Sequence, residues 1–180
     1  MTDTNERDPP TIEAVYEAHH DFVWRSIVRL GVPAAEVDDG VQEVFLAAAR
    51  RLSEFEGRAA MSTWLFAIAM RVAQRLRRDA FRHNRRVQAY ERSAPTGKVD
   101  PYAHSEAAQL LHRLLDHLDD ERRAVYILVE LEGMTAPEVS EALGVKVPTV
   151  YTRLRAARRT MAEALAVEQT AGQEGAGGDE

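Results

Sequence analysis

The sequence predicts an all-α protein of two small helical domains joined by a linker, with a helix-turn-helix in the second domain. Apolar residues recur at helical spacing along most of the chain, and no stretch alternates with period two for long enough to form a strand. Turn-forming residues gather in SAPTGKVDP, residues 93–101, which indicates a linker. We therefore expect an N-terminal domain over 11–88, a linker over 89–105 and a C-terminal domain over 106–167.

The N-terminal domain should contain three helices. The first, TIEAVYEAHHDFVWRSIVRLG, carries an apolar stripe and should stop at Gly31, a residue type that commonly ends helices. The second should begin at Pro33, because proline suits the first helical position, and run to about Phe55. The third should run from near Ser62 to about Arg86.

The C-terminal domain should contain four helices. AAQLLHRLLDHL is helical by its leucines, and DERRAVYILVELEG should end at Gly133. TAPEVSEALG opens with a capping box, in which Thr135 and Glu138 satisfy each other's end of the helix, and stops at Gly144. The last helix should begin at Pro148, so helix, short glycine-containing turn and helix follow one another as in a helix-turn-helix.

Both ends of the chain have compositions typical of disorder. Residues 1–10 are polar and acidic, and residues 168–180 are rich in glycine and acid. The first residues lack the features of a secretory signal, no apolar run reaches the roughly 18 residues of a membrane span, and there is no cysteine. These observations favour a soluble, cytoplasmic protein without membrane insertion.

Charge is distributed unevenly along this chain, whose net charge is −6. Residues 71–92 contain eight arginines but only two acids, Asp79 and Glu91. Residues 144–159 contain five cations and no acid. Local patches, rather than the total, decide whether a polyanion binds. Two basic patches on an acidic chain therefore indicate two nucleic-acid contacts and at least one surface for another partner.

The last helix has the amphipathic pattern of a recognition helix. Its expected buried stripe consists of Val150, Leu154, Ala157, Met161 and Leu165. On the opposite side, Thr152 and Arg155 are the best candidates for reading bases, followed by Tyr151 and Thr149. Arg158 and Arg159 are expected to bind phosphates. The alternative is a merely solvated face, but the capping box, the glycine turn and the absence of acids favour DNA recognition.

The third helix carries a line of arginines beside its core stripe. The line consists of Arg71, Arg75, Arg78 and Arg82, and it begins at an aromatic residue, Trp64. Like charges at this spacing destabilise an isolated helix, and a polyanionic partner would offset that cost. Trp64 by itself is more typical of an aromatic residue at the edge of the core.

Two further segments of the N-terminal domain suggest binding surfaces. The segment SEFEGRAAMS, residues 53–62, precedes the arginine line and could hold an unstacked base. The second helix places acidic and amide side chains on its outer surface, at Asp38, Asp39, Gln42 and Glu43. This acidic face is either an ordinary solvated surface or a docking site for a basic protein.

Three motifs together resemble those of a bacterial RNA polymerase sigma factor of the extracytoplasmic-function (ECF) type. DDGVQEVFLAA is similar to the helix that binds core polymerase, and FEGRAAMSTWLFAIAMRVA is similar to the promoter-melting loop and the helix that reads the −10 element. The segment from LLDHLDDERR to TVYTRLRAARR resembles the domain that reads the −35 element. The resemblance covers about residues 12–165 and places the three motifs in the expected order.

The resemblance implies that the protein directs core polymerase to promoters and helps to open them. The acidic face would bind the polymerase, through the clamp helices of the β′ subunit, and β would be a second polymerase partner. The last helix would enter the −35 major groove. An anti-sigma factor is a further candidate partner. The −10 contacts would come from Glu56, Gly57, Arg58, Met61, Ser62, Arg71, Arg75, Arg78 and Arg82.

Some positions depart from the family pattern. Arg71 and Arg75 stand where an asparagine and an acid are usual, which would make −10 binding depend more on backbone charge. Other departures are Met61, Pro148 and the pair Tyr151-Thr152. Gly40 replaces an apolar residue in the polymerase-binding helix and should weaken that helix by about 1 kcal/mol relative to alanine.

Two other functions fit the sequence less well. An autonomous helix-turn-helix regulator would not need the acidic helix coupled to the arginine line. An enzyme is disfavoured, because the six histidines form no ligand set such as H-E-x-x-H. We therefore expect no cofactor, no metal and no catalytic residue.

Overall fold

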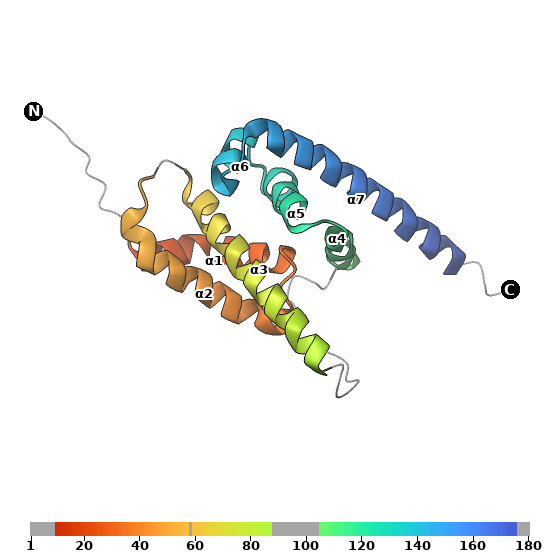
Figure 1. The fold of residues 1–180 in the computed structure, drawn as a ribbon, viewed down its shortest axis with the longest axis horizontal. Coiled ribbons are helices and arrows are strands. Elements are labelled where there is room, and N and C mark those ends of the chain that lie inside the picture. Colours follow the sequence, from red (N-terminus) through yellow and green to blue (C-terminus); the bar gives the residue numbers. More distant parts are fainter. Residues whose placement is uncertain (1–9, 58, 88–104, 176–180) are drawn as a thin grey trace, which may run out of the picture.

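The computed structural model describes residues 10–57, 59–87 and 105–175, and these contain helices and turns but no strand (Figure 1). The all-α prediction is confirmed. The N-terminal half comprises α1 (Ile12–Arg29), a 3₁₀ turn (Ala34–Glu36), α2 (Val37–Arg51), a second 3₁₀ turn (Leu52–Glu54) and α3 (Met61–Val87). The C-terminal half comprises α4 (Glu106–Asp116), α5 (Asp120–Tyr126), a π-helical turn (Ile127–Leu131), α6 (Ala136–Leu143) and α7 (Val147–Gly175).

Two predicted bounds of the second helix are wrong. Pro33 has an extended ψ of 139° and precedes a 3₁₀ turn, so α2 begins at Val37. At the other end a 3₁₀ turn follows α2, and Phe55 closes it in an extended conformation by donating its N–H to the Leu52 carbonyl over 3.0 Å. The first and third helices lie close to their predicted bounds, and Gly31 adopts the left-handed φ of 81° that ends the first helix.

Gly40 has a packing role that its low helix propensity concealed. It is buried where α2 contacts α1 and α3, and a Cβ on it would lie 3.0 Å from Leu76 Cδ1 and 3.3 Å from Ile27 Cγ2. The absence of a side chain therefore allows the three helices to approach closely. The expected loss of helix stability is accompanied by closer packing of the N-terminal core.

Short polar caps define the helices of the C-terminal half. The Ser105 hydroxyl accepts the Ala108 N–H at the start of α4, and the Asp119 carboxylate accepts the Arg122 N–H at the start of α5. The predicted capping box of α6 is present, since the Thr135 N–H donates to the Glu138 carboxylate over 2.8 Å. The helix then ends, as predicted, at a glycine in the left-handed conformation.

The last helix extends beyond the boundary predicted at residue 167. Helix α7 continues to Gly175, so the start of disorder predicted at 168 is too early. One cause is a two-point ion pair, in which Arg113 of α4 donates to both carboxylate oxygens of Glu168 over 3.1 and 3.2 Å. The rest of the predicted tail, almost all of the predicted linker and residues 1–9 lie outside the described residues.

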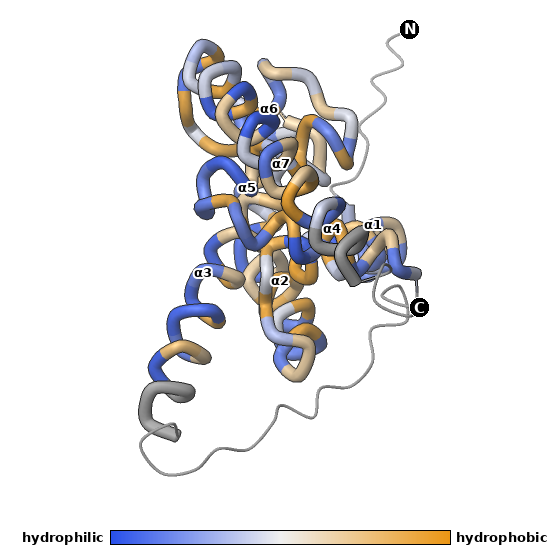
Figure 2. The backbone as a smooth tube through the Cα atoms, turned by 90° about the vertical axis from the view of Figure 1, so that its right-hand side faces the viewer, coloured by the Kyte–Doolittle hydropathy of each residue, from blue (hydrophilic) through white to orange (hydrophobic). Residues whose placement is uncertain are grey.

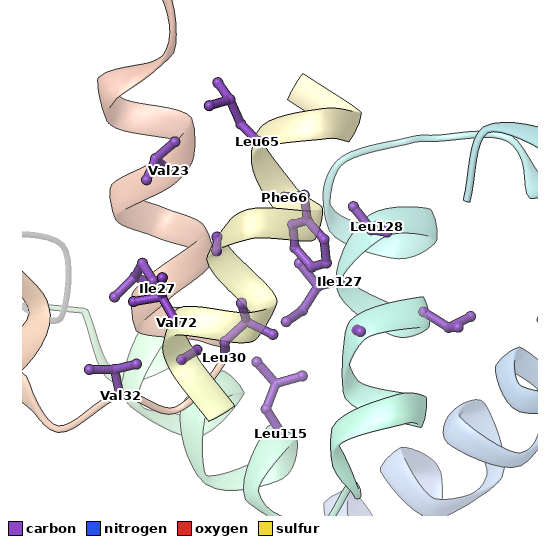
Figure 3. Packing of buried hydrophobic residues seen from close by; sticks show 14 of the residues in the cluster. Val23, Ile27, Leu30, Val32, Leu65, Phe66, Val72, Leu115, Ile127 and Leu128 are labelled. Atoms are coloured by element: carbon purple, nitrogen blue, oxygen red, sulfur yellow. The ribbon is translucent and has the colours of Figure 1, made fainter. Parts of the chain in front are cut away.

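The two halves share one hydrophobic core. Buried side chains from α1 and α3 meet those from α5 and its π-helical continuation, so the cluster is continuous between the halves. Figure 3 shows Phe66 of α3 beside Ile127 and Leu128, with Leu30 above Leu115. The two predicted domains therefore pack directly against each other. Figure 2 shows apolar segments gathered in this interior, whereas the C-terminal part of α3 is largely hydrophilic and extends away from it.

Charged groups reinforce this contact surface, which we call the seam. Glu132, after α5, forms an ion pair with Arg29 of α1 and lies 3.9 Å from Arg25. Arg77 of α3 forms an ion pair with Asp120 at the start of α5. Each pair joins one half to the other, so specific electrostatic contacts add to the apolar core in holding the two halves together. We call this packed arrangement of the two halves closed.

Arg123 is the largest buried side chain at the seam, with only 1% of its surface exposed. Its Nε donates to the Leu115 carbonyl over 2.9 Å, and its Nη2 binds the carboxylate of Asp116. The guanidinium lies directly under Gly31, where a Cβ would come within 2.1 Å of Nη1. The glycine is therefore required both for its left-handed turn and for the space that it leaves to this arginine.

Candidate nucleic-acid interface

Helices α6 and α7 form a helix-turn-helix with a well-defined turn. Gly144 has a φ of 65°, the Val145 N–H donates to the Ser140 carbonyl, and the Ser140 hydroxyl donates to the Val145 carbonyl over 2.5 Å. Four members of the predicted stripe of α7 are buried, as expected, and the fifth, Leu165, is only partly buried. Ala164 continues the buried stripe in its place. This packing fixes the side of α7 that faces solvent.

The predicted base-reading residues lie on that solvent face. Tyr151 is 59% exposed, Thr152 and Arg155 are exposed, and Thr149 is half-buried. The Thr152 hydroxyl donates to the Pro148 carbonyl over 2.9 Å. Because the hydroxyl proton is taken up by this hydrogen bond, the side chain can offer DNA only an acceptor oxygen and a methyl group.

The cations of α7 differ in their surroundings. Arg158 donates twice to Glu130, over 2.8 and 2.6 Å, so the predicted phosphate contact would require this pair to exchange partners. Arg159 is 3.8 Å from Glu163, and both side chains are exposed. Arg155 has no acidic partner within the described ranges. It is therefore the most available cation on the face of α7 that is predicted to read bases.

The arginine line of α3 also lies on an exposed face, but acids interrupt it. Arg75 forms an ion pair with Glu43 of the acidic face and lies 4.0 Å from Asp79, which is 3.6 Å from Arg82. Arg71 and Arg78 are exposed and have no acidic partner in the part of the chain that the structure describes. Sequence reasoning missed the pair with Glu43 because its partners are 32 residues apart.

A concavity of about 230 Å³ lies at the start of α3, where an unstacked base was expected. Its walls include Phe55, Glu56 and Gly57 of the loop and Thr63 and Trp64 of α3. Trp64 is partly buried, as its core-edge interpretation predicts, and its ring centre lies 5.4 Å from that of Phe55. Arg58 lies outside the described residues.

Two other features of this concavity concern the predicted site. Met61 and Ser62 are half-buried at the first turn of α3 and do not belong to the residues that line the concavity. Glu141 and Ala142 of α6 do line it, although they belong to the other half of the chain. The closed arrangement thus places an acid and a helix against the pocket that was expected to receive DNA.

The acidic face of α2 borders an apolar groove. Asp38, Asp39 and Gln42 are exposed and Glu43 is half-buried. Beside them, a groove of about 650 Å³ runs between α1 and α2, with Tyr16 and Leu46 about half exposed. The surface therefore combines negative charge with apolar area, as a surface that binds a basic protein segment would.

Two features are absent from the described ranges, 10–57, 59–87 and 105–175. These ranges contain no cluster of three or more His, Asp or Glu residues arranged to hold a metal ion. Nor do they contain a helix with the length and apolarity of a membrane span. Among the histidines, partial burial lowers the pKa of His19.

Comparison with known proteins identifies the family to which the chain belongs. The family models Sigma-70 region 2 and Sigma-70, region 4 match residues 15–86 and 108–161. RNA polymerase sigma factor NccH of Alcaligenes xylosoxydans xylosoxydans is 32% identical over 148 residues, which cover 77% of this chain and 78% of that protein. The chain belongs to the ECF family of RNA polymerase sigma factors. The ECF RNA polymerase sigma-E factor of Escherichia coli (strain K12) is 29% identical over 157 residues, covering 76% of this sigma factor and 77% of that protein.

Solved structures agree with this assignment. The structure of CnrH in complex with the cytosolic domain of CnrY has a TM-score of 0.65 and 26% identity, and covers 87% of this sigma factor and 88% of that chain. RpoE in complex with the anti-sigma factor NepR from Bartonella quintana has a TM-score of 0.69 at 18% identity, covering 86% and 96%, and supports the fold. The sigma factor directs RNA polymerase to promoters, and the match to region 2 disfavours an autonomous helix-turn-helix regulator.

Proposed function

We propose that this sigma factor binds polymerase and promoter DNA through three separate surfaces. The acidic face of α2 binds the clamp helices of the polymerase β′ subunit, the loop before α3 and the arginine line bind the −10 element, and the exposed face of α7 binds the −35 element. The protein acts in the cytoplasm, where polymerase and promoters meet, as an initiation factor without covalent chemistry of its own.

The observation that carries this proposal is the concavity at the start of α3. It is large enough for a base, it has an aromatic wall at Phe55 and Trp64, and the exposed Arg71 and Arg78 follow it along the same helix. Extruding a base costs a few kcal/mol, which stacking and pocket contacts can recover. The cations would hold the phosphates on either side of that base.

Promoter binding requires the two halves to separate. The −10 and −35 elements are about 25 base pairs apart, or about 85 Å at 3.4 Å per base pair. Helices α3 and α6 are in contact in the closed arrangement, and α6 lines the −10 concavity. We therefore assign the closed arrangement to the protein free of polymerase and propose that the seam opens when polymerase binds.

An anti-sigma factor is the proposed partner of the inactive protein. Support comes from CnrH, whose structure is a complex with the cytosolic domain of CnrY and resembles this chain over most of its length. A partner that held the seam closed would keep α6 against the −10 concavity. It would thereby prevent promoter binding without contacting α7.

Run-off transcription with purified core polymerase on genomic fragments tests the proposed function. The full-length protein should give specific transcripts with polymerase, and in mobility-shift assays it should bind promoter duplex well only as the holoenzyme. Specific, tight duplex binding by the free protein, without transcripts, would instead support an autonomous regulator.

The acidic face is tested by reversing one charge. Asp39→Lys should weaken polymerase binding about tenfold, because a like charge would face the basic clamp. Glu163→Lys is the matched control, since it makes the same charge change on an exposed part of α7. Equal polymerase affinity in the two variants would show that the face of α2 is only a solvated surface.

A further inference from the structure

Phe81 is an exposed aromatic residue in the most basic part of α3. Its side chain is 63% exposed, and it lies among Arg77, Arg78 and Arg82. These four residues line a concavity of about 520 Å³ that also includes the turn between α1 and α2 and Asp120 at the start of α5. Phe81 lies to one side of the arginine line, so the −10 surface assigned above does not include it.

The charge of this concavity fits a polyanion. Its lining contains three arginines and one acid, and that acid, Asp120, already forms an ion pair with Arg77. Arg78 has no acidic partner among the residues described by the structure, and Arg82 has only the exposed Asp79 at 3.6 Å. Two adjacent cations beside an exposed ring are the combination that binds single-stranded nucleic acid, through phosphates and a stacked base respectively.

We propose that Phe81 stacks on an unpaired base of the promoter, while Arg78 and Arg82 hold the neighbouring phosphates. The inference rests on the proposed function and adds a second aromatic contact to the one at Trp64. The occupant is single-stranded DNA rather than a protein, because the cations flank the ring and nucleic-acid bases offer the flat surface that the ring can cover.

The helix sets the spacing of these two aromatic contacts. Phe81 follows Trp64 by seventeen residues of the same helix, which is about 26 Å at 1.5 Å per residue. A stacked strand advances 3.4 Å per nucleotide, so the base on Phe81 should lie about seven to eight nucleotides from the base in the concavity beside Trp64. This distance distinguishes the proposal from a general attraction of arginines to DNA.

A fluorescent-base scan tests the proposal in the holoenzyme. 2-Aminopurine is placed at successive positions of the single strand in a premelted promoter, and its fluorescence is measured with wild-type protein, Phe81→Ala, Phe81→Trp and Phe81→Leu. Wild-type protein and Phe81→Trp should quench one position about seven to eight nucleotides from the captured base. Phe81→Ala and Phe81→Leu should lose that quenching and about tenfold of the affinity for the strand.

Val167→Ala is the matched control, because Val167 is equally exposed and apolar but lies on α7. It should leave the scan unchanged. A Phe81→Ala scan identical to wild type would overturn the inference. Full quenching by Phe81→Leu would also overturn it, because the quenching would then not require an aromatic ring. Loss of all transcripts with wild-type protein would instead contradict the proposed function itself.

Discussion

Helices α3 and α7 are both rich in arginine, but the acids that pair with their arginines come from different places. On α7, Arg153 and Arg158 pair with Glu121 and Glu130, which belong to the same half of the chain. On α3, Arg75 pairs with Glu43 of the acidic face, and Arg77 pairs with Asp120 across the seam. Apart from Asp79 on α3 itself, the acids that pair with the arginines of α3 therefore come from other elements of the fold.

Because of this difference, the two helices are not equally accessible to DNA in the closed protein. The proposed −35 face of α7 is exposed in the closed protein, so a DNA groove could reach its N-terminal residues. The proposed −10 surface is lined in part by α6 and partly neutralised by Glu43. We infer that −35 binding depends mainly on α7 itself, whereas −10 binding depends on opening of the seam and on what contacts α2.

The largest expected effect concerns the seam. Gly31→Ala should lower the free energy of unfolding by about 3 kcal/mol, because alanine is strained at this φ and would displace the buried Arg123. Gly133→Ala is the control, since Gly133 has a similar φ of 69° but open space around it, and it should cost about 1 kcal/mol. Urea unfolding measures both; equal losses would show that Arg123 moves without cost.

The next effect tests the exposed face of α7. Arg155→Ala should weaken binding of the holoenzyme to its −35 element by about 10- to 100-fold and relax base preference at one position. Arg153→Ala removes the same charge from a side chain that pairs with Glu121 on the other side of the helix, and should leave base preference unchanged. Competition binding with single-base variants of the element provides the measurement. Identical preference profiles for Arg155→Ala and wild type would contradict the assignment.

A smaller effect concerns the coupling of the two N-terminal surfaces. Glu43→Gln should release Arg75 and raise the affinity of the free protein for a single-stranded −10 oligonucleotide by about two- to fivefold, as expected for an exposed ion pair. Glu121→Gln breaks an ion pair with Arg153 in the C-terminal half of the chain and should have no such effect. Fluorescence anisotropy at low salt would detect the change, and equal affinities would show that the pair does not restrain Arg75.

The smallest effect is a pH dependence in the helix-turn-helix. Hydrogen bonds from the Thr135 hydroxyl, and secondarily from its backbone N–H, lower the pKa of Glu138. A carboxylate whose pKa is lowered on folding stabilises the protein above its unfolded pKa of about 4.3, and this contribution is lost as pH falls through the lowered value. The stability difference between wild type and Glu138→Gln should therefore narrow below about pH 4.3 in urea titrations. A constant difference would exclude the capping carboxylate as its source.

Local features of the fold could be predicted from the sequence, whereas the seam could not. The stripe of α7 and the capping box of α6 depend on residues within a few turns, so periodicity and spacing predict them. Nothing local distinguishes Arg122, which is exposed, from Arg123, which is buried under Gly31. The pairing of Arg75 with Glu43 likewise depends on how α2 packs against α3, and a single sequence carries no direct signal of that contact.

The central claim is that the closed protein must open to engage a promoter. The chain has no cysteine, so Arg29→Cys with Glu132→Cys places two unique thiols at a seam ion pair, outside the proposed DNA and polymerase surfaces. A short bis-methanethiosulfonate reagent would join them, and a reductant would release them. Run-off transcription should be abolished in the cross-linked protein and restored by the reductant. Transcription at the wild-type rate by the cross-linked protein would contradict the account.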